Sequence, residues 1–336
     1  MKPCYIHSAV SISAQETFQK ELFLENTLIH KSTIVKAIQP KYREFISPAV
    51  SRRMATGVKM GVVTAKIALQ EAIIENPNAI ITGTGMGCIE DSEKFLTSII
   101  NNNEEYLTPT SFIQSTHNTV GAQIALGLKC KAYNMTYVHG SSSFESALLD
   151  TQLLLNEEEN TTVLVGGVDE LGKKFITDYA VLEDEKKVPY SEGAHFFTVS
   201  NTSKNYEAIL SAVDCIQSIT IDEITRRTIN FLKENNLETS DVDAVFFGKN
   251  GDKHDVYYDK LQESLFTNTI QLQYKNLCGE FHTASAFGFW VATKVLKTQT
   301  IPDVLRLNSV KKSSYKTVLL YNQNKGAYHS FTLLTV

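Results

Sequence analysis

The chain has 336 residues, a length at which about two domain-sized units of ~150 residues are expected. Hydrophobic residues make up 43% of the sequence, which is ordinary for a soluble globular protein and sufficient for a large buried core. The 32 Lys and Arg residues face 37 Asp and Glu residues, giving a formal net charge of -5. This acidic balance argues against a dedicated nucleic-acid binder, which needs a basic surface for phosphates.

No apolar stretch approaches the ~18–20 residues that cross a bilayer, so we expect no membrane span. The first residues lack the basic start and long apolar run of a signal peptide. Five cysteines are scattered along the chain without a CxxC pair, so we expect neither a disulfide framework nor a structural zinc site. These features predict a cytoplasmic protein.

Short β-branched runs alternate with longer amphipathic stretches along the chain. Strands are predicted at 79–82, 134–138, 162–165, 191–200, 244–247 and 317–321. Apolar residues that recur three or four positions apart predict helices at roughly 51–75, 90–102, 117–128, 141–156, 221–236, 256–265 and 281–297. The alternation predicts a layered α/β protein with a largely parallel core sheet.

The polar stretch 200–206 is the best place to divide the chain, and no low-complexity linker separates two independent domains. We therefore predict an N-terminal half at 1–203 and a C-terminal half at 204–336, packed tightly together. Each half begins with a strand and continues through strand–helix alternation, which indicates a duplicated unit.

A glycine-rich segment, Gly83-Thr84-Gly85-Met86-Gly87, follows the first of these predicted strands. Dinucleotide sites use the pattern G-x-G-x-x-G, but position 88 is Cys. The segment is therefore predicted to be a turn between a strand and a helix, and no cofactor is expected.

The turn around Ser141 lies between a predicted strand and a predicted helix, in the sequence His139-Gly140-Ser141-Ser142-Ser143. Such a turn presents a small side chain and free backbone N–H groups at a helix N-terminus, which suits a nucleophile beside an oxyanion site. A serine at a helix start is also a common N-cap. The local sequence leaves both interpretations open.

The segment 134–171 resembles the nucleophile region of the β-ketoacyl synthases of fatty-acid and polyketide synthesis. In that family a strand leads to the catalytic Cys and a helix, and the next strand ends in Gly-Gly before an acidic residue. Alignment on Gly166 and Gly167 without a gap places Ser141 at the position of the Cys. Three further segments are similar to the family, so the resemblance covers most of the chain: 51–72, 107–136 and 191–200.

The resemblance also implies that the other catalytic positions have changed. The first family histidine maps to Phe247, and the second, in a Lys-x-x-x-Gly-His motif, maps to Glu280 after the retained Lys275. The family glutamate that pairs with this lysine, fourteen residues on, maps to Phe289. Near the C-terminus, Lys325 replaces a gating aromatic of the family's Phe-Gly-Phe-Gly-Gly loop.

These replacements argue against condensation chemistry. A serine hydroxyl needs a positioned base before it becomes a nucleophile, whereas a thiol at a helix N-terminus ionises readily. The loss of two imidazoles removes donors that would stabilise an enolate, and a carboxylate at position 280 would oppose its charge.

Two histidines near Ser141 are candidates for a general base. His139 precedes the turn and His282 follows Glu280 by two residues, so either could form a dyad with Ser141. The alternative is that both are ordinary hydrogen-bonded or surface histidines. The hydrolase pattern Gly-x-Ser-x-Gly is absent, and an esterase is not expected.

The resemblance implies a thiolase-like fold in which two similar α/β halves pack as αβαβα layers. It implies a subunit of the chain-length-factor type that is not active alone. Such a subunit pairs with a Cys-bearing ketosynthase as a heterodimer, in the carrier-protein-dependent chain elongation of fatty-acid, polyketide or aryl-polyene systems. The acyl carrier protein would be met through that complex.

Two alternatives stay open at this stage. One is an acyltransferase or decarboxylase of the same fold that acts through Ser141. The other is a homodimeric protein that binds an acyl chain without a covalent adduct.

Overall fold

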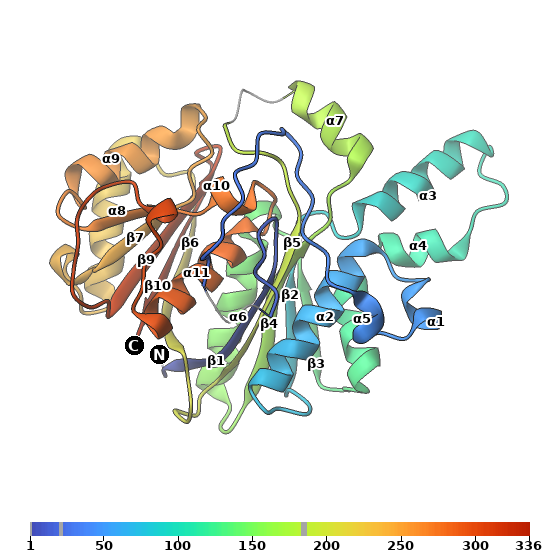
Figure 1. Ribbon diagram of the computed structural model, residues 1–336, viewed down its shortest axis with the longest axis horizontal. Coiled ribbons are helices and arrows are strands. Elements are labelled where there is room, and N and C mark those ends of the chain that lie inside the picture. The colour runs from blue at the N-terminus through green and yellow to red at the C-terminus, as the bar shows by residue number, and fades with distance from the viewer. Residues whose placement is uncertain (1, 20–22, 183–186) are drawn as a thin grey trace.

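The computed structural model describes residues 2–19, 23–182 and 187–336, which form one ten-stranded mixed sheet with helices on both faces (Figure 1). The strands are β1 Cys4–Ile12, β2 Ala79–Gly83, β3 Tyr133–Tyr137, β4 Thr162–Asp169, β5 Gly193–Ser200, β6 Ala208–Gln217, β7 Ala244–Phe247, β8 Ile270–Gln273, β9 Thr317–Asn324 and β10 Tyr328–Thr335. The α-helices are α1 Pro48–Ser51, α2 Thr56–Glu71, α3 Ile89–Asn101, α4 Pro109–Ser115, α5 Thr119–Leu128, α6 Ser143–Glu157, α7 Lys173–Leu182, α8 Ile221–Glu234, α9 Val256–Ser264, α10 Lys275–Cys278 and α11 Ala284–Thr298.

The strand order repeats itself on the two sides of the sheet. The full order is β3-β2-β4-β5-β1-β6-β10-β9-β7-β8. From the outer edge inward, the N-terminal half runs β3, β2, β4, β5, β1 and the C-terminal half runs β8, β7, β9, β10, β6. The two halves therefore have the same strand order. The halves join through a short antiparallel β1–β6 contact, in which Tyr5 faces Ile209. The division at 203/204 falls in the connection between β5 and β6 and stays a prediction.

The expectation of a largely parallel sheet is wrong at the centre. Only the outer strands are parallel, in the sets β3-β2-β4 and β8-β7-β9. The strands β4, β5, β1, β6, β10 and β9 pair antiparallel with one another. The β9–β10 pair explains part of the difference because a turn of only three residues joins it, with positive φ at Lys325 and at Gly326.

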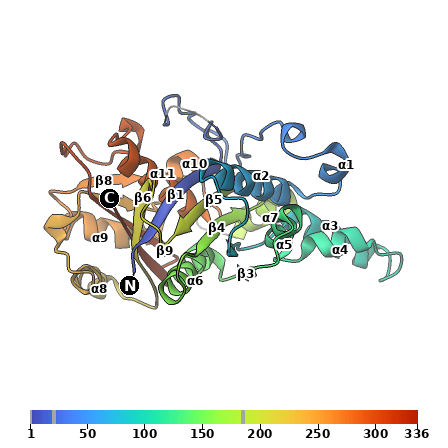
Figure 2. The same cartoon turned by 90° about the horizontal axis from the view of Figure 1, so that it is seen from below.

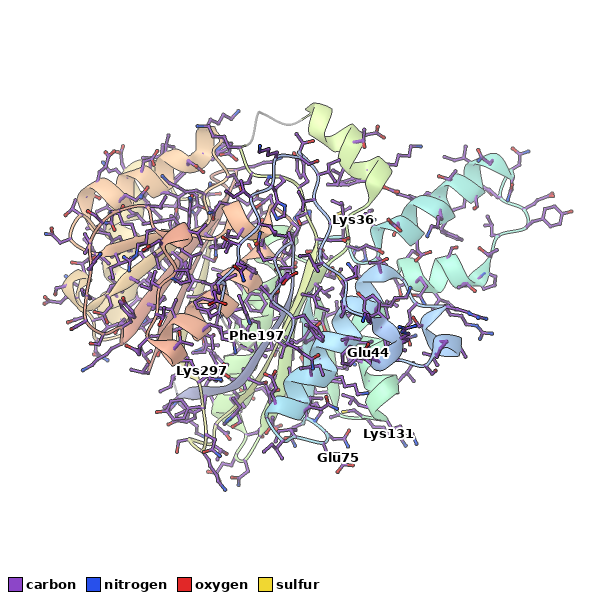
Figure 3. The ribbon with its side chains drawn as sticks, viewed as in Figure 1. Lys36, Glu44, Glu75, Lys131, Phe197 and Lys297 are labelled. Atoms are coloured by element: carbon purple, nitrogen blue, oxygen red, sulfur yellow. The ribbon has the colours of Figure 1, made fainter. Side chains whose placement is uncertain are left out.

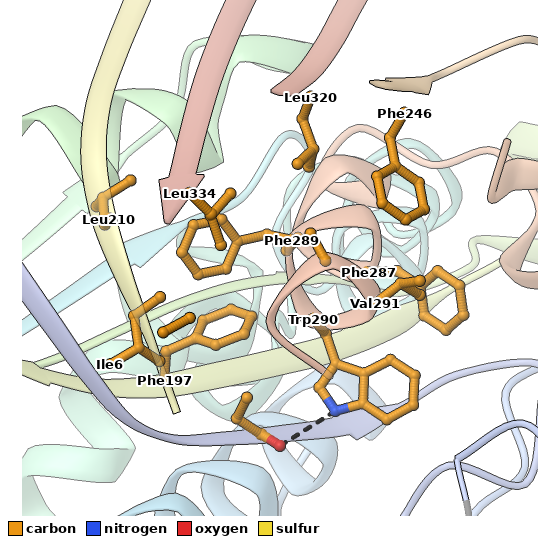
Figure 4. Close-up of a cluster of buried hydrophobic side chains, with 14 of the residues drawn as sticks. Ile6, Phe197, Leu210, Phe246, Phe287, Phe289, Trp290, Val291, Leu320 and Leu334 are labelled. Carbon is orange, nitrogen blue, oxygen red and sulfur yellow. Dashed lines mark hydrogen bonds between the residues drawn. The ribbon is translucent and has the colours of Figure 1, made fainter. Parts of the chain in front are cut away.

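The structure has the five layers that the resemblance implied, and three clusters of buried hydrophobic side chains hold these layers together. One cluster packs α2 and α5 on the N-terminal half-sheet, and another packs α8 and α9 on the C-terminal half-sheet. The third holds α6 and α11 between the two half-sheets, where Phe197 of β5 and Phe289 of α11 pack ring against ring with centroids 4.7 Å apart (Figure 4). In the same cluster the indole Nε1 of Trp290 donates to the carbonyl of Ala9, 3.1 Å away. The αβαβα arrangement is confirmed.

Glycines allow the central helices to reach the site. A Cβ on Gly167 of β4 would lie 2.9 Å from the Cβ of Ala286 and 3.0 Å from that of Thr283, and Phe144 of α6 is also close. Gly167 therefore lets the starts of α6 and α11 meet at the end of β4, whereas Gly166 leaves room for Phe196 of β5.

A helical hairpin of α3 and α4 projects from the N-terminal half in two perpendicular views (Figures 1 and 2). Its helices pack against each other, with the rings of Phe95 and Phe112 5.4 Å apart. Among the described residues, no helix has both the length and the apolar character needed to cross a membrane.

Candidate functional site

The turn that carries Ser141 is held by its neighbour Ser143. β3 leads through a short 3-10 turn, Gly140–Ser142, into α6, and Gly140 has the positive φ of +57° that the turn requires. The Ser143 hydroxyl accepts a hydrogen bond from the His139 N–H at 2.8 Å and lies 2.6 Å from the Gly140 carbonyl. Ser143 therefore fixes the backbone of the turn.

Ser141 itself is neither a cap nor an activated nucleophile in this geometry. Its Oγ has less than 1 Å² of exposed surface and makes no hydrogen bond within the described part of the chain. A hydroxyl that no base touches and no solvent reaches is a poor nucleophile. The N-cap interpretation fails as well, because the Ser141 side chain bonds no helix N–H.

A small cavity of about 20 Å³ brings Ser141 together with two of the other sequence-predicted residues, Lys275 and Glu280. The Lys275 Nζ lies 2.6 Å from Glu280 Oε2, and both side chains are largely buried. The carboxylate at the family's histidine position thus neutralises the retained lysine. Replacing either partner of such a buried pair is strongly destabilising, because the remaining charge is left uncompensated.

Phe247 and Phe289, which the resemblance maps to a family histidine and a family glutamate, do not line this cavity. Phe247 is fully buried in the cluster beneath α8 and α9, with its ring 5.9 Å from that of Tyr258. Phe289 lies in the central layer against Phe144 and Phe197. Both point away from the cavity because alternate residues of a strand, and opposite sides of a helix, face different layers.

Tyr274 and Asn322 occupy the space next to β7. The Tyr274 hydroxyl donates to Asn322 Oδ1, and a Cβ on Gly248 would lie 3.0 Å from that hydroxyl. A larger side chain at position 248 therefore has no room. Asn322 begins the segment that resembles the family's Phe-Gly-Phe-Gly-Gly loop, and Tyr274 directly precedes the Lys275 motif, but sequence reasoning did not pair them because they are distant along the chain.

Glu145 was also missed, although it lies only four residues after Ser141, in the first turn of α6. The side chain is 1% exposed, and its Oε1 accepts a hydrogen bond from Ser330 Oγ at 3.2 Å. Burial raises the pKa of this carboxyl, and the attraction of Lys275 only partly offsets that rise. The site thus holds one lysine for two carboxyl groups.

The histidines differ in their relation to Ser141. His139 is exposed and its Nδ1 lies 2.9 Å from Ser146 Oγ, so it is engaged away from the cavity. His282 lines the same cavity as Ser141 and packs against Gly85, where a Cβ would lie 2.2 Å from the imidazole Cγ.

Asp169 at the end of β4 joins the glycine-rich turn to the start of α11. Its Oδ1 accepts from the N–H groups of Gly85 and Met86 at 2.8 and 3.1 Å and from the Thr84 hydroxyl at 3.0 Å. Its Oδ2 accepts from the N–H and hydroxyl of Thr283 at 2.9 and 2.8 Å. The backbone amides that a dinucleotide site would offer to phosphate are therefore already bonded, as expected for a structural turn.

A second, larger cavity of about 140 Å³ lies beside the first and shares Glu280, Phe281, His282 and Asn324 with it. Its walls come from the β2–α3 turn, the start of α7, the segment before α11 and the β9–β10 turn. Most of its side chains are apolar or aromatic.

The model of the β-ketoacyl synthase N-terminal domain family matches residues 30–220. A β-ketoacyl synthase from Burkholderia phymatum is similar in structure, with a TM-score of 0.79, 14% identity, and coverage of 100% of this chain and 99% of that one. The ishigamide ketosynthase/chain length factor gives a TM-score of 0.79 at 13% identity, with 100% and 99% covered. A ketosynthase in complex with its chain length factor from Xenorhabdus doucetiae gives 0.71 at 14% identity, with 100% and 98% covered. No curated protein matches the chain.

The buried carboxyl of Glu145 predicts a pH dependence of stability. Because its pKa is raised in the folded state, the stability associated with this group is fully present below the unfolded pKa and is lost as pH rises through the folded value. We expect Glu145→Gln to raise the melting temperature relative to the parent at pH 8 and to change it little at pH 4.5. Each kcal/mol of added stability should raise the melting temperature by about 2–4 °C.

Thermal unfolding from pH 4.5 to pH 8.5 measures this difference. Glu157→Gln, at the exposed end of the same helix, is the matched control and should follow the parent throughout. A Glu145→Gln variant whose difference from the parent does not grow with pH would contradict the assignment.

Proposed function

Because this chain belongs to the β-ketoacyl synthase family, we propose that it is a non-catalytic, chain-length-factor-type subunit that pairs with a Cys-bearing ketosynthase. The observation that carries the proposal is the environment of Ser141, which the resemblance places at the position of the family's nucleophile. Ser141 Oγ is buried without a hydrogen-bond partner among the described residues, beside a lysine that is already neutralised by Glu280. The scaffold of the family is complete, whereas the groups for condensation are replaced.

An apolar edge of the N-terminal half supports pairing with another subunit. β3 is the last strand of the sheet and pairs only with β2, so one edge of its backbone is open. Large apolar side chains are exposed on this strand and on the neighbouring helices α3 to α6: Leu96, Ile100, Phe112, Ile113, Leu126, Tyr133, Met135, Val138 and Leu153. We call this surface the β3 face. A monomer rarely exposes so much contiguous apolar surface without a partner.

The hairpin of α3 and α4 extends the β3 face outward. Phe112 and Ile113 of α4 are each 54% exposed. In a complex formed through the β3 face, these side chains would reach the partner and could form a wall of its acyl tunnel. The Xenorhabdus doucetiae structure is such a complex of a ketosynthase with its chain length factor.

A basic surface beside the larger cavity supports contact with an acyl carrier protein. The segment 31–59 carries seven basic residues and a single acidic one, Glu44, in a chain with a net charge of -5 (Lys36 and Glu44 are labelled in Figure 3). Lys36 lies 3.7 Å from Glu90, whereas no ion pair to another described residue occurs at four exposed side chains: Lys41, Arg43, Arg52 and Arg53. We call this segment the basic strip.

The basic strip leads to the mouth of the larger cavity. The N–H of Val35 donates to the Tyr190 carbonyl at 2.9 Å, and Tyr190 is part of the cavity wall. An acidic carrier that rests on the strip would therefore hold its prosthetic arm near the shared entrance of the complex, with charge complementarity steering the encounter.

The geometry gives no support to the alternative of an acyltransferase or decarboxylase that acts through Ser141. Such an enzyme needs a base in contact with the hydroxyl, and neither His139 nor His282 forms that hydrogen bond. The 20 Å³ cavity also leaves no room for an acyl group beside Ser141.

Co-expression with a Cys-bearing ketosynthase from the same source tests the pairing. We expect the two chains to co-purify as a heterodimer, and we expect Met135→Arg on β3 to lower the yield of complex at least about tenfold, since a charge buried in the interface has no partner. Ile221→Arg on α8 is the matched control, because Ile221 is 39% exposed and Met135 is 38% exposed.

Size-exclusion chromatography with mass determination distinguishes the outcomes. A Met135→Arg chain that pairs as well as the parent contradicts the β3 face as the interface. Failure of the parent chain to pair with the ketosynthase contradicts the proposed function.

Charge reversal on the basic strip tests the contact with the carrier. We expect Arg52→Glu with Arg53→Glu to lower kcat/KM of the complex for carrier-bound substrate about tenfold, through weaker association rather than slower chemistry. The salt dependence of the reaction should also become shallower. The reversal of two exposed lysines on the opposite half, Lys233→Glu with Lys260→Glu, should leave kcat/KM unchanged. Equal effects of both double variants would contradict the strip as the docking surface.

A further inference from the structure

The larger cavity beside Ser141 is a preformed site whose walls are fixed by hydrogen bonds. It has a volume of about 140 Å³, and its apolar interior comes from two sides. Met86 and Ile89 lie on one side, in the β2–α3 turn and the start of α3, and Phe281 and His282 lie on the other side, before α11. The Asp169 carboxylate bonds both sides at once, to the Met86 N–H at 3.1 Å and to the Thr283 N–H at 2.9 Å.

Most of the charged groups in the walls are already engaged, whereas Glu170 Oε2 and Ser191 Oγ bond no other described residue. Asp169 accepts hydrogen bonds from Thr84, Gly85, Met86 and Thr283, and Glu280 is paired with Lys275 at 2.6 Å. Glu170 accepts from the N–H of Thr56 at the start of α2, 3.0 Å away. A charged ligand would lose its hydration in this cavity, and burial raises the pKa of Glu170, the carboxyl with a free oxygen, to about 7, so an uncharged ligand is favoured.

The size and lining of the cavity favour one aromatic ring. An apolar protein cavity of about 150 Å³ holds a benzene molecule, whereas a long alkyl chain exceeds that volume. The walls include the rings of Phe175, Tyr190 and Phe281 and the thioether of Met86, which make favourable edge and sulfur contacts with an aromatic guest.

We propose that this cavity binds an uncharged molecule of single-ring size, non-covalently. Binding is non-covalent because Ser141 lies in the separate, smaller cavity and its Oγ is buried. The inference goes beyond the proposed function and does not depend on it, since it concerns this chain's own cavity and no partner.

Methionine-methyl NMR provides a readout that needs no activity. The chain has five methionines, so their methyl signals can be resolved after selective labelling. Met86 lies in the cavity wall, whereas Met60 is buried in α2 and Met135 lies on β3. In the full-length chain, titration with benzyl alcohol should shift the Met86 methyl upfield in a saturable way and leave Met60 and Met135 unchanged.

Matched probes and variants define the class of ligand. Cyclohexylmethanol and dodecan-1-ol should bind at least about tenfold more weakly than benzyl alcohol, which corresponds to ~1.4 kcal/mol. Ile176→Trp, which fills the cavity from α7, should abolish the shift, and Ile221→Trp on α8 should preserve it.

The outcomes decide the proposal directly. Absence of a saturable Met86 shift, equal shifts at all methionines, or equal affinity for the aliphatic probes would each overturn it. Pairing with a ketosynthase is measured separately, so a negative result here leaves the test of the proposed function intact.

Discussion

The structure depends on two helices, α6 and α11, that are covered by sheet on both sides. Each lies between the N-terminal and C-terminal half-sheets, and twelve of the fifteen residues of α11 are buried. Because neither helix can move without breaking the central core, their N-terminal ends are held together at the end of β4. Gly167 makes this contact sterically allowed, since a Cβ there would collide with Ala286 and Thr283. The site is therefore a consequence of the core, and it persists even though its chemistry has changed.

Charge pairing is the second feature of the interior around Ser141. Lys275 is nearly buried, and its Nζ lies 2.6 Å from Glu280 Oε2. Glu145 is a second carboxyl that the charge of Lys275 attracts, and burial raises the pKa of Glu145. Tyr274 and Asn322 fill the space beside Gly248. These groups form a hydrogen-bonded interior that stabilises the contact between the two halves.

The sequence was sufficient for the layer arrangement and for part of the site. Strong apolar periodicity located the core strands β2, β4, β7 and β9 and the long helices, and the Gly-Gly motif aligned Ser141 with its place at the start of α6. Lys275 and Glu280 lie five residues apart around α10, so a local motif could find them together. The layer that Phe247 and Phe289 face could not be read from a motif, because a one-residue step along a strand, or half a turn of a helix, moves a side chain to another layer.

The remaining parts of the site arise from contacts that no local pattern encodes. Asp169 binds Thr84 and Thr283, which lie far from it in sequence on both sides, and Tyr274 binds Asn322 across the C-terminal half. The antiparallel centre of the sheet was missed for a similar reason, because the pairing of β1 with β5 and β6 is set by tertiary packing. Glu145 is the exception, since it lies only four residues after Ser141 in the sequence.

Condensation from acyl- and malonyl-carrier protein by crossed variants tests the central claim most directly. The assay compares the chain alone, its complex with the ketosynthase, the complex whose partner has its nucleophilic Cys replaced by Ala, and the complex with Ser141→Ala in this chain. A non-catalytic subunit predicts no product from the chain alone, loss of product with the altered partner, and a rate within about twofold of the parent complex for Ser141→Ala. Condensation by the chain alone that disappears in Ser141→Ala would contradict the account.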